Sequence, residues 1–155
     1  MSDDLHALEA WAGALLAKLQ PAQRRAINHK VAIDLRRSQA QRIKAQQGPD
    51  GAAYPARKRR KELKGKNGRI KRQKATMFNK IRTARYLKVS ANPEKITLGF
   101  FNRIARIAQI HQYGLQDHIT KSGKPYKYTQ RKLLGLSQTD QSLIRESLIS
   151  YIKLL

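Results

Sequence analysis

Apolar residues recur at helical spacing near the N-terminus of the chain. Residues 3–19 place leucines and alanine on one side of a helix, and in residues 21–46 the apolar residues Ile27, Val31 and Leu35 repeat at intervals of four. Gln20-Pro21 separates the two stretches, because proline cannot continue a helix but suits the first turn of the next one. The pattern predicts two N-terminal helices that form a helical hairpin or a bent pair.

The spacing of apolar residues changes in the middle of the chain. Residues 86–90 and 95–101 alternate between apolar and polar positions, which is the period of a half-buried strand, and the turn 91–94 contains Asn and Pro. This predicts an antiparallel hairpin. We also expect a short helix at 75–83 and a second, ragged hairpin within 115–130.

Helical spacing returns after the predicted hairpin. Residues 102–113 form a helix with both ends marked, since Asn102 suits the N-cap and Gly114 can leave the helix with positive φ at no steric cost. Its expected apolar face consists of Ile104, Ile107, Ala108 and His111. Leucines at 133, 134 and 136, which we call the leucine clamp, precede a last helix at 137–153. Ser137 and Asp140 are expected to form a capping-box-like pair at its start.

Together these elements predict one α+β domain spanning residues 1–155. The N-terminal helices and the C-terminal helix pack on a small antiparallel sheet, and a long basic loop interrupts the chain. The expected parts are a helical part at 3–47, a flexible basic loop at 52–74, and an α+β part at 75–155 that ends in the C-terminal helix.

The charge of the chain is extreme, with 33 Lys and Arg against ten Asp and Glu, for a net charge of +23. Residues 57–74 hold one acid, Glu62, and a dense run of cations with no sustained apolar period. Low hydrophobicity with high net charge predicts a flexible loop in the free protein. The cations of this run are the candidate contacts to a polyanion: Arg57, Lys58, Arg59, Arg60, Lys61, Lys64, Lys66, Arg69, Lys71, Arg72 and Lys74.

Three interpretations of the basic run remain open. It can contact phosphates of a nucleic acid, which would make binding strongly salt-dependent. It can dock on an acidic protein surface, or it can be a solvated loop without a partner. Aromatic residues only flank the run, so stacking on single-stranded bases is not supported.

The residue types of the chain argue against an enzyme. The four histidines are not paired with a carboxylate or another histidine at metal-binding spacing, and His111 is expected to be a structural residue near the core. The acids are scattered, and the chain has no cysteine and no phosphate-binding glycine loop. We therefore expect no catalytic residues, no metal and no cofactor. No apolar run approaches a membrane span or a secretory signal.

Two segments carry a resemblance to a known family. Residues 107–115 read Ile-Ala-Gln-Ile-His-Gln-Tyr-Gly-Leu, and residues 131–137 read Arg-Lys-Leu-Leu-Gly-Leu-Ser. Together with Arg36-Arg37-Ser38-Gln39, the Pro49-Asp50-Gly51 turn and Met77-Phe78, they resemble the phage virion morphogenesis family, the tail-completion proteins of contractile-tailed phages. The residues that this resemblance marks for assembly or the core are His111, Tyr113, Gly114, Leu133, Leu134 and Leu136.

The resemblance implies a structural protein of the virion. Such a protein would complete the head-proximal end of a tail and support joining of the tail to the head. It would act as a homo-oligomer, in a six-fold ring, beside other tail and neck proteins and near DNA in the channel. It would be located in the virion, and in the host cytoplasm during assembly.

Two other functions compete with this one. A small basic nucleic-acid-binding protein explains the charge but not the segments at 111–114 and 133–136. A nuclease would need several carboxylates that converge on a divalent metal beside a phosphate, and the sequence offers no such cluster.

Overall fold

The computed structural model describes residues 2–57, 76–118 and 123–153 of the chain. Within these residues it contains four helices and two separate two-stranded antiparallel sheets, so the predicted α+β fold is confirmed. Residues 58–74 of the predicted basic loop lie outside the described residues. The elements in chain order are α1 (Ser2–Leu16), α2 (Pro21–Lys44), β1 (Leu87–Ala91), β2 (Ile96–Phe100), α3 (Asn102–Tyr113), β3 (Gln116–His118), β4 (Pro125–Lys127) and α4 (Gln138–Ile152).

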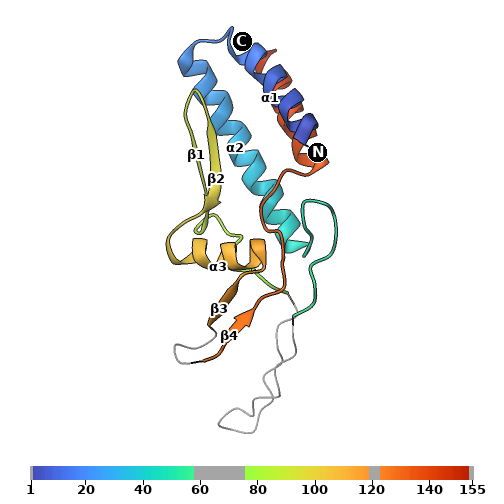
Figure 1. Cartoon of the computed structure of the whole chain (residues 1–155). Helices are drawn as coiled ribbons and strands as arrows, with labels where there is room; N and C mark the ends of the chain where they lie inside the picture. The colour runs from blue at the N-terminus through green and yellow to red at the C-terminus, as the bar shows by residue number, and fades with distance from the viewer. Residues whose placement is uncertain (1, 58–75, 119–122, 154–155) are drawn as a thin grey trace.

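Helix α2 is the spine of an elongated molecule (Figure 1). Helices α1 and α4 pack beside one end of α2, and α1 and α2 form the helical hairpin that Pro21 predicts. The hairpin β1–β2 runs along α2, and α3 and the hairpin β3–β4 lie toward the far end. None of the described helices is long and apolar enough to cross a membrane.

Two hydrophobic clusters lie along this spine. The first, which we call the terminal core, joins α1, α2 and α4, and Leu136 packs against it. Its buried members are Ile27, Val31, Leu35 and Leu148. The second, the central core, lies where α2 meets α3 and the segments around them. Its buried members are Ile43, Tyr54, Ile81, Ala108 and Leu133.

The first hairpin has the predicted strands and turn. Its register pairs Leu87 with Phe100 and Ala91 with Ile96. The side chain of Asn92 closes the turn, because its oxygen accepts from the backbone N–H groups of residues 94 and 95 at 2.9 and 2.7 Å. The side chain of Asn28 in α2 donates to the Asn92 carbonyl at 2.7 Å, which fixes the tip of the hairpin on the spine.

Helix α3 ends as predicted but begins differently. Gly114 has φ 65° and ψ 42°, and the Leu115 N–H donates to the Ile110 carbonyl at 2.9 Å, as in a Schellman motif. A Cβ on Gly114 would lie 3.1 Å from the Gln130 nitrogen. The prediction of Asn102 as N-cap is wrong. Phe101 is the N-cap, without a side-chain capping bond, and Asn102 itself has φ 57°.

The expected apolar face of α3 is also partly wrong. Ile107 is 45% exposed, whereas Ile110 is buried. The ion pair between Arg106 and Asp117 of β3 lies on the side of α3 that also carries Ile110, because these two helical residues are four positions apart. The predicted helix at 75–83 is also wrong, since residues 76–78 have no regular structure and residues 79–83 form turns and a bend.

Helix α4 begins with the expected capping box. The Ser137 hydroxyl accepts from the Asp140 N–H at 3.1 Å, and the Asp140 carboxylate accepts from the Ser137 N–H at 2.9 Å. The second predicted hairpin is confirmed in β3 and β4, which pair Gln116 with Lys127 and His118 with Pro125.

Candidate assembly surface

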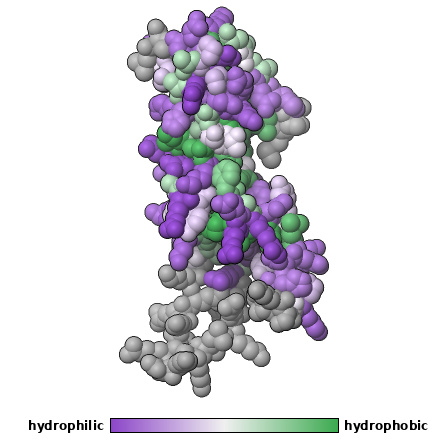
Figure 2. Space-filling view, turned by 90° about the vertical axis from the view of Figure 1, so that its left-hand side faces the viewer, coloured by the Kyte–Doolittle hydropathy of each residue, from purple (hydrophilic) through white to green (hydrophobic). Residues whose placement is uncertain are grey.

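Helix α3 and its two ends expose an unusual number of large apolar side chains. Phe101 is 48% exposed, Tyr113 is 63% exposed, and Ile107 and Leu115 are each more than 40% exposed. Figure 2 shows the side of the molecule that carries β1–β2 and α3, where apolar residues interrupt a mostly hydrophilic surface in the middle part. Exposed apolar patches with polar surroundings are typical of protein–protein contacts.

A groove runs beside this helix with a volume of about 310 Å³. One wall is the face of α3 that carries Ala105 and Gln109, and Phe100 and Leu134 contribute from the neighbouring segments. The full lining consists of Phe100, Ala105, Ala108, Gln109, Gln112, Tyr113 and Leu134. No carboxylate belongs to this lining, so the groove is apolar with amide groups at its edge.

The side chain of Gln112 fixes the leucine clamp against α3. Its Oε1 accepts from the backbone N–H groups of Leu133 and Leu134 at 2.7 and 3.0 Å, and its Nε2 donates to the Leu134 carbonyl at 2.9 Å. The amide therefore pairs with the extended backbone as a neighbouring strand would. One wall of the groove depends on these three hydrogen bonds.

A second polar network holds the clamp on α2. Asp140 has no exposed surface, and its carboxylate accepts from Ser38 Oγ, from Gln39 Nε2 at 3.0 Å and from the capping residue Ser137. Gln39 Nε2 also donates to the Gly135 carbonyl at 2.9 Å. The buried carboxylate thus ties α2 to the start of α4.

Arg42 completes this network. Its Nη2 donates to Gln39 Oε1 and to the carbonyl groups of Leu133 and Gly135. Burial lowers the pKa of Arg42, and the carboxylate of Asp140 opposes this effect. Gly135 itself packs closely on the turn after α2, since a Cβ there would lie 2.5 Å from Pro49 Cγ.

His111 is part of a row of aromatic rings. Its ring makes edge contacts with Phe78 and Tyr128 at centroid distances of 4.8 and 5.2 Å, and Tyr54 makes a similar contact with Phe78. Burial, and then the charges of Arg131 and Arg57, lower the pKa of His111 to about 4. The imidazole is therefore neutral at neutral pH, and its position fits the expected structural role near the core.

Arg131 and Tyr54 hold the segment that leads into the basic run. Arg131 is buried, and its guanidinium donates to the carbonyl groups of Pro55 and Ala56 at 2.9 and 3.0 Å. Burial raises the pKa of Tyr54 to about 12, so its hydroxyl stays protonated and donates to the Lys132 carbonyl at 3.1 Å. The first cation of the run, Arg57, is described and exposed.

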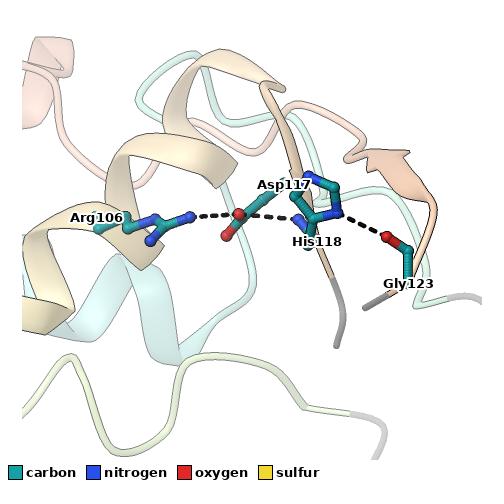
Figure 3. Close-up of polar contacts among 4 residues, drawn as sticks. All are labelled: Arg106, Asp117, His118 and Gly123. Carbon is teal, nitrogen blue, oxygen red and sulfur yellow. Dashed lines mark hydrogen bonds and ion pairs between the residues drawn. The ribbon is translucent and has the colours of Figure 1, made fainter. Parts of the chain in front are cut away.

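The hairpin β3–β4 is fixed to α3 by an ion pair (Figure 3). Arg106 Nη2 lies 2.5 Å from Asp117 Oδ1, which also accepts from the His118 N–H at 2.9 Å. His118 Nδ1 lies 2.7 Å from the Gly123 carbonyl oxygen and so links the end of β3 to the segment that precedes β4. The hydrogen bond from the His118 N–H, and then the contact with Arg106, lower the pKa of Asp117.

Charge is divided unevenly between two parts of the molecule. Residues 57–132, which we call the basic half, hold 23 of the 33 cations and three of the ten acids, for a net charge of +20. The rest, which we call the helical half, contains α1, α2 and α4 and has a net charge of +3. The basic character therefore extends well beyond the run at 57–74.

The residues marked for assembly or the core fall into different places. His111 and Leu133 lie in or beside the central core, Leu136 packs on the terminal core, and Gly114 ends α3. Leu134 and Tyr113 line the groove. Of the eleven cations at 57–74 only Arg57 is described; Lys58, Arg59, Arg60, Lys61, Lys64, Lys66, Arg69, Lys71, Arg72 and Lys74 lie outside the described residues.

Sequence reasoning missed the polar residues that hold the site together. Gln39, Arg42 and Gln112 act through backbone carbonyl and N–H groups far away in sequence, so neither periodicity nor a motif indicates their partners. The sequence feature that could have indicated these residues is a Gln or Arg on a helix face whose other residues are apolar. In the part of the chain that the structure describes, no group of three or more His, Asp or Glu is placed to hold a metal ion.

Comparison with known proteins extends over nearly the whole chain. Residues 3–153 match the phage virion morphogenesis family. The chain is 36% identical over 140 residues to the tail completion protein S of Escherichia phage P2, covering 90% of this chain and 91% of that protein. No solved structure matches the chain. Because the family match and the similarity to this relative both extend over nearly the whole chain, the chain belongs to the phage virion morphogenesis family.

Proposed function

We propose that this protein is a structural component of a phage virion that completes the head-proximal end of the tail and supports joining of the tail to the head. The observation that carries the proposal is the similarity to a tail completion protein over 90% of the chain. The exposed apolar surface of α3 supports it, because a protein that works only within an assembly needs such a surface. The role is structural, with no catalytic step.

We propose further that the protein works as a ring of identical subunits around the tail axis, beside other tail and neck proteins. A subunit with a net charge of +23 repels its copies unless an anion or an acidic neighbour offsets the charge. The basic half is the part that would face this partner. DNA in the channel is the polyanion that fits best, and an acidic tail or neck protein is the other source of negative charge.

Quantitative mass spectrometry of density-purified particles tests the structural role. The expected result is a few copies to about a dozen per particle, at a fixed ratio to the tail-tube protein. A strain that lacks the gene should accumulate unjoined heads and tails, and the gene supplied in trans should restore joining. A protein that is abundant in the lysate but absent from particles would contradict the proposal and favour a free nucleic-acid-binding protein.

The partner of the basic half can be tested with charge variants. Replacing the cations at 57–74 by Gln should weaken binding to duplex DNA and reduce its salt dependence by about 0.9 in log–log slope per lost phosphate contact. A matched variant with Gln at exposed α2 positions such as Arg25 and Arg37 should retain most of the slope. If the loop variant binds DNA normally but fails in head–tail joining, the partner is an acidic protein.

A further inference from the structure

The two faces of the hairpin β1–β2 carry different kinds of side chain. Ile96 and Leu98 pack against the terminal core and Phe100 packs against the central core, so these residues face the spine. Side chains alternate along a strand and paired residues share a face, so the residues between them and their register partners form the opposite face. This outer face consists of Lys88, Ser90, Thr97 and Gly99 and has no aliphatic or aromatic side chain.

The described structure gives no packing reason for the glycine on this face. Glycine weakens a strand, because it has no side chain to pack and more backbone freedom to lose. A Cβ on Gly99 would meet no atom within 4 Å, and Gly99 does not have a positive φ. The register runs through the pair Lys88–Gly99 without a bulge. A strand glycine of this kind is typical of a place where a ligand or another backbone approaches closely.

The chain around the outer face is strongly cationic. Residues 80–103, all of which the structure describes, contain six cations and one acid, for a net charge of +5. Lys88 lies on the outer face, Arg85 precedes β1 and Arg103 lies in the first turn of α3, and all three are exposed. None of these three forms an ion pair with a carboxylate of the described residues. Their charge is therefore available to an anionic partner.

The three cations lie near each other, at the end of the hairpin that leads into α3 (Figure 1). Because a chain spans at most about 3.6 Å per residue, the Cα atoms of Arg85 and Lys88 lie within about 11 Å of each other. By the same limit, the Cα of Arg103 lies within about 14 Å of the Cα of Gly99, the register partner of Lys88. Phosphates along one strand of duplex DNA follow each other every ~3.4 Å of helix axis, so a surface of this size can contact several of them.

We propose that the outer face of β1–β2, with Arg85 and Arg103 beside it, contacts the phosphate backbone of duplex DNA. This inference rests on the anionic partner in the proposed function and specifies both that partner and the surface that meets it. Lysine, arginine and hydroxyl side chains are among the groups that contact phosphates and sugars in protein–DNA complexes. Gly99 lets the sugar–phosphate backbone lie close to β2, next to Lys88 and the two hydroxyl groups of the face.

The composition of the outer face favours duplex DNA over other anionic partners. A stable contact with an acidic protein needs aromatic or aliphatic anchors at its centre, and the outer face has none. The exposed apolar residues of this region begin at Phe101, beyond the end of β2. A single strand would need aromatic rings on which its bases stack. Because contacts to phosphates carry no sequence information, binding should not depend on the DNA sequence.

Two glycine variants of the full-length protein test the close approach without a change of charge. Gly99→Gln fills the open space above β2 and should weaken binding to a short labelled duplex about eightfold, the effect of one lost phosphate contact at about 0.1 M salt. Fluorescence anisotropy measures the binding. Gly13→Gln in α1 is the matched control, because a Cβ there also meets no atom within 4 Å, and it should bind as the wild type does. Circular dichroism should show that both variants are folded.

Charge variants test the electrostatic part of the contact. Lys88→Gln and Arg103→Gln should each weaken binding about eightfold at about 0.1 M salt and lower the log–log slope of binding against salt by about 0.9. The matched controls Lys18→Gln and Arg145→Gln remove the same charge from exposed positions of the helical half and should keep the wild-type slope. Unlabelled duplexes of unrelated sequence should compete equally well.

Three results would overturn the proposed contact. The first is that the wild-type protein does not bind duplex DNA. The second is wild-type affinity and salt slope in Gly99→Gln, Lys88→Gln and Arg103→Gln, which would assign the DNA contact to another surface. The third is normal DNA binding by these variants together with a failure to join heads and tails, which would assign the outer face to an acidic protein.

The outcome separates this inference from the proposed function. If mass spectrometry finds the protein in particles but the hairpin variants bind DNA as the wild type does, the structural role stands and this surface is wrong. If the protein is absent from particles, the structural role fails, and the binding measurements still decide whether the outer face of β1–β2 contacts DNA.

Discussion

The helical half and the basic half of this protein are built on different principles. In the helical half, α1, α2 and α4 bury apolar stripes in the terminal core, and one of its helices has a local capping box that its own sequence specifies. In the basic half, short strands and turns are held largely by side chains that bond to distant backbone groups. The two halves meet in the central core, where Ile43 and Leu133 pack with Ile81 and Ala108.

The difference shows how a chain with high net charge keeps an ordered structure. In the described part of the basic half the buried apolar residues are Ile81, Leu87, Ala108 and Ile110, and hydrogen bonds from glutamine and arginine side chains add to their contacts. Gln46 illustrates this, because its amide donates to the Met77 carbonyl at 2.9 Å and accepts from the Met77 N–H at 2.8 Å. Each such bond contributes only about 1 kcal/mol, which makes the basic half the weaker part.

The largest expected effect comes from truncation of each core in turn. Leu133→Ala in the central core and Ile27→Ala in the terminal core each remove a fully buried side chain and should each cost about 2–5 kcal/mol. Because α2 contributes to both cores, we expect a single unfolding transition in urea. Trp11 fluorescence reports on the helical half and far-UV circular dichroism on the whole chain. Separate midpoints in Leu133→Ala would show that the halves unfold independently.

The second-largest effect is expected at Asp140, the buried carboxylate that ties α2 to the start of α4. Asp140→Ala removes the carboxylate half of the α4 capping box and takes one buried acceptor from Ser38 and Gln39, so the free energy of unfolding should fall by about 2–4 kcal/mol. Chemical denaturation measures the change. Glu146→Ala, on the exposed side of the same helix, is the matched control and should change stability by less than about 0.5 kcal/mol. Equal effects of the two variants would contradict the network.

The third-largest effect is expected at Gln112, which holds the groove wall formed by Leu134. Gln112→Ala breaks three hydrogen bonds to Leu133 and Leu134 and should cost about 1–3 kcal/mol. Amide exchange of the clamp backbone should accelerate more than exchange in α2, because the loss is local. Gln109→Ala, in the same groove but exposed, should leave clamp exchange unchanged.

The smallest expected effect is the pH dependence that His111 contributes. In the unfolded chain its pKa is near 6.5, and in the folded protein it is about 4, so the unfolded state binds the proton more readily between these values. Stability should therefore decrease as the pH falls from 6.5 toward 4, and this residue should cause no further loss below that range. Since the ring is only partly buried and solvent screens its charge, the expected loss is about 1 kcal/mol.

His111→Phe tests this assignment. The phenyl ring keeps the edge contacts with Phe78 and Tyr128 but cannot bind a proton. The stability difference between pH 6.5 and pH 4 should shrink relative to wild type, as measured by urea midpoints at both pH values. An unchanged difference would show that other groups cause the acid sensitivity.

Whether a sequence prediction agrees with the structure depends on how far apart in the sequence the interacting residues are. The α2 stripe, the β1–β2 hairpin, Gly114 and the Ser137–Asp140 capping box all depend on residues close in sequence, and all were predicted. The N-cap at Asn102 was predicted wrongly: the extended residue Phe101, directly after β2, is the N-cap, and no side chain caps the first turn of α3. The helix at 75–83 failed because Met77 is held in place by Gln46 of a distant segment.

The sequence by itself therefore determined the class of fold, the family and the division of charge, because periodicity, short motifs and residue types are local properties. Only the tertiary structure decided which face of α3 is exposed. It placed Leu134 and Tyr113 in one groove and assigned Gln39, Arg42 and Gln112 to the clamp. These features depend on contacts between residues 22 to 96 positions apart, and periodicity, short motifs and residue types do not show which distant segments meet.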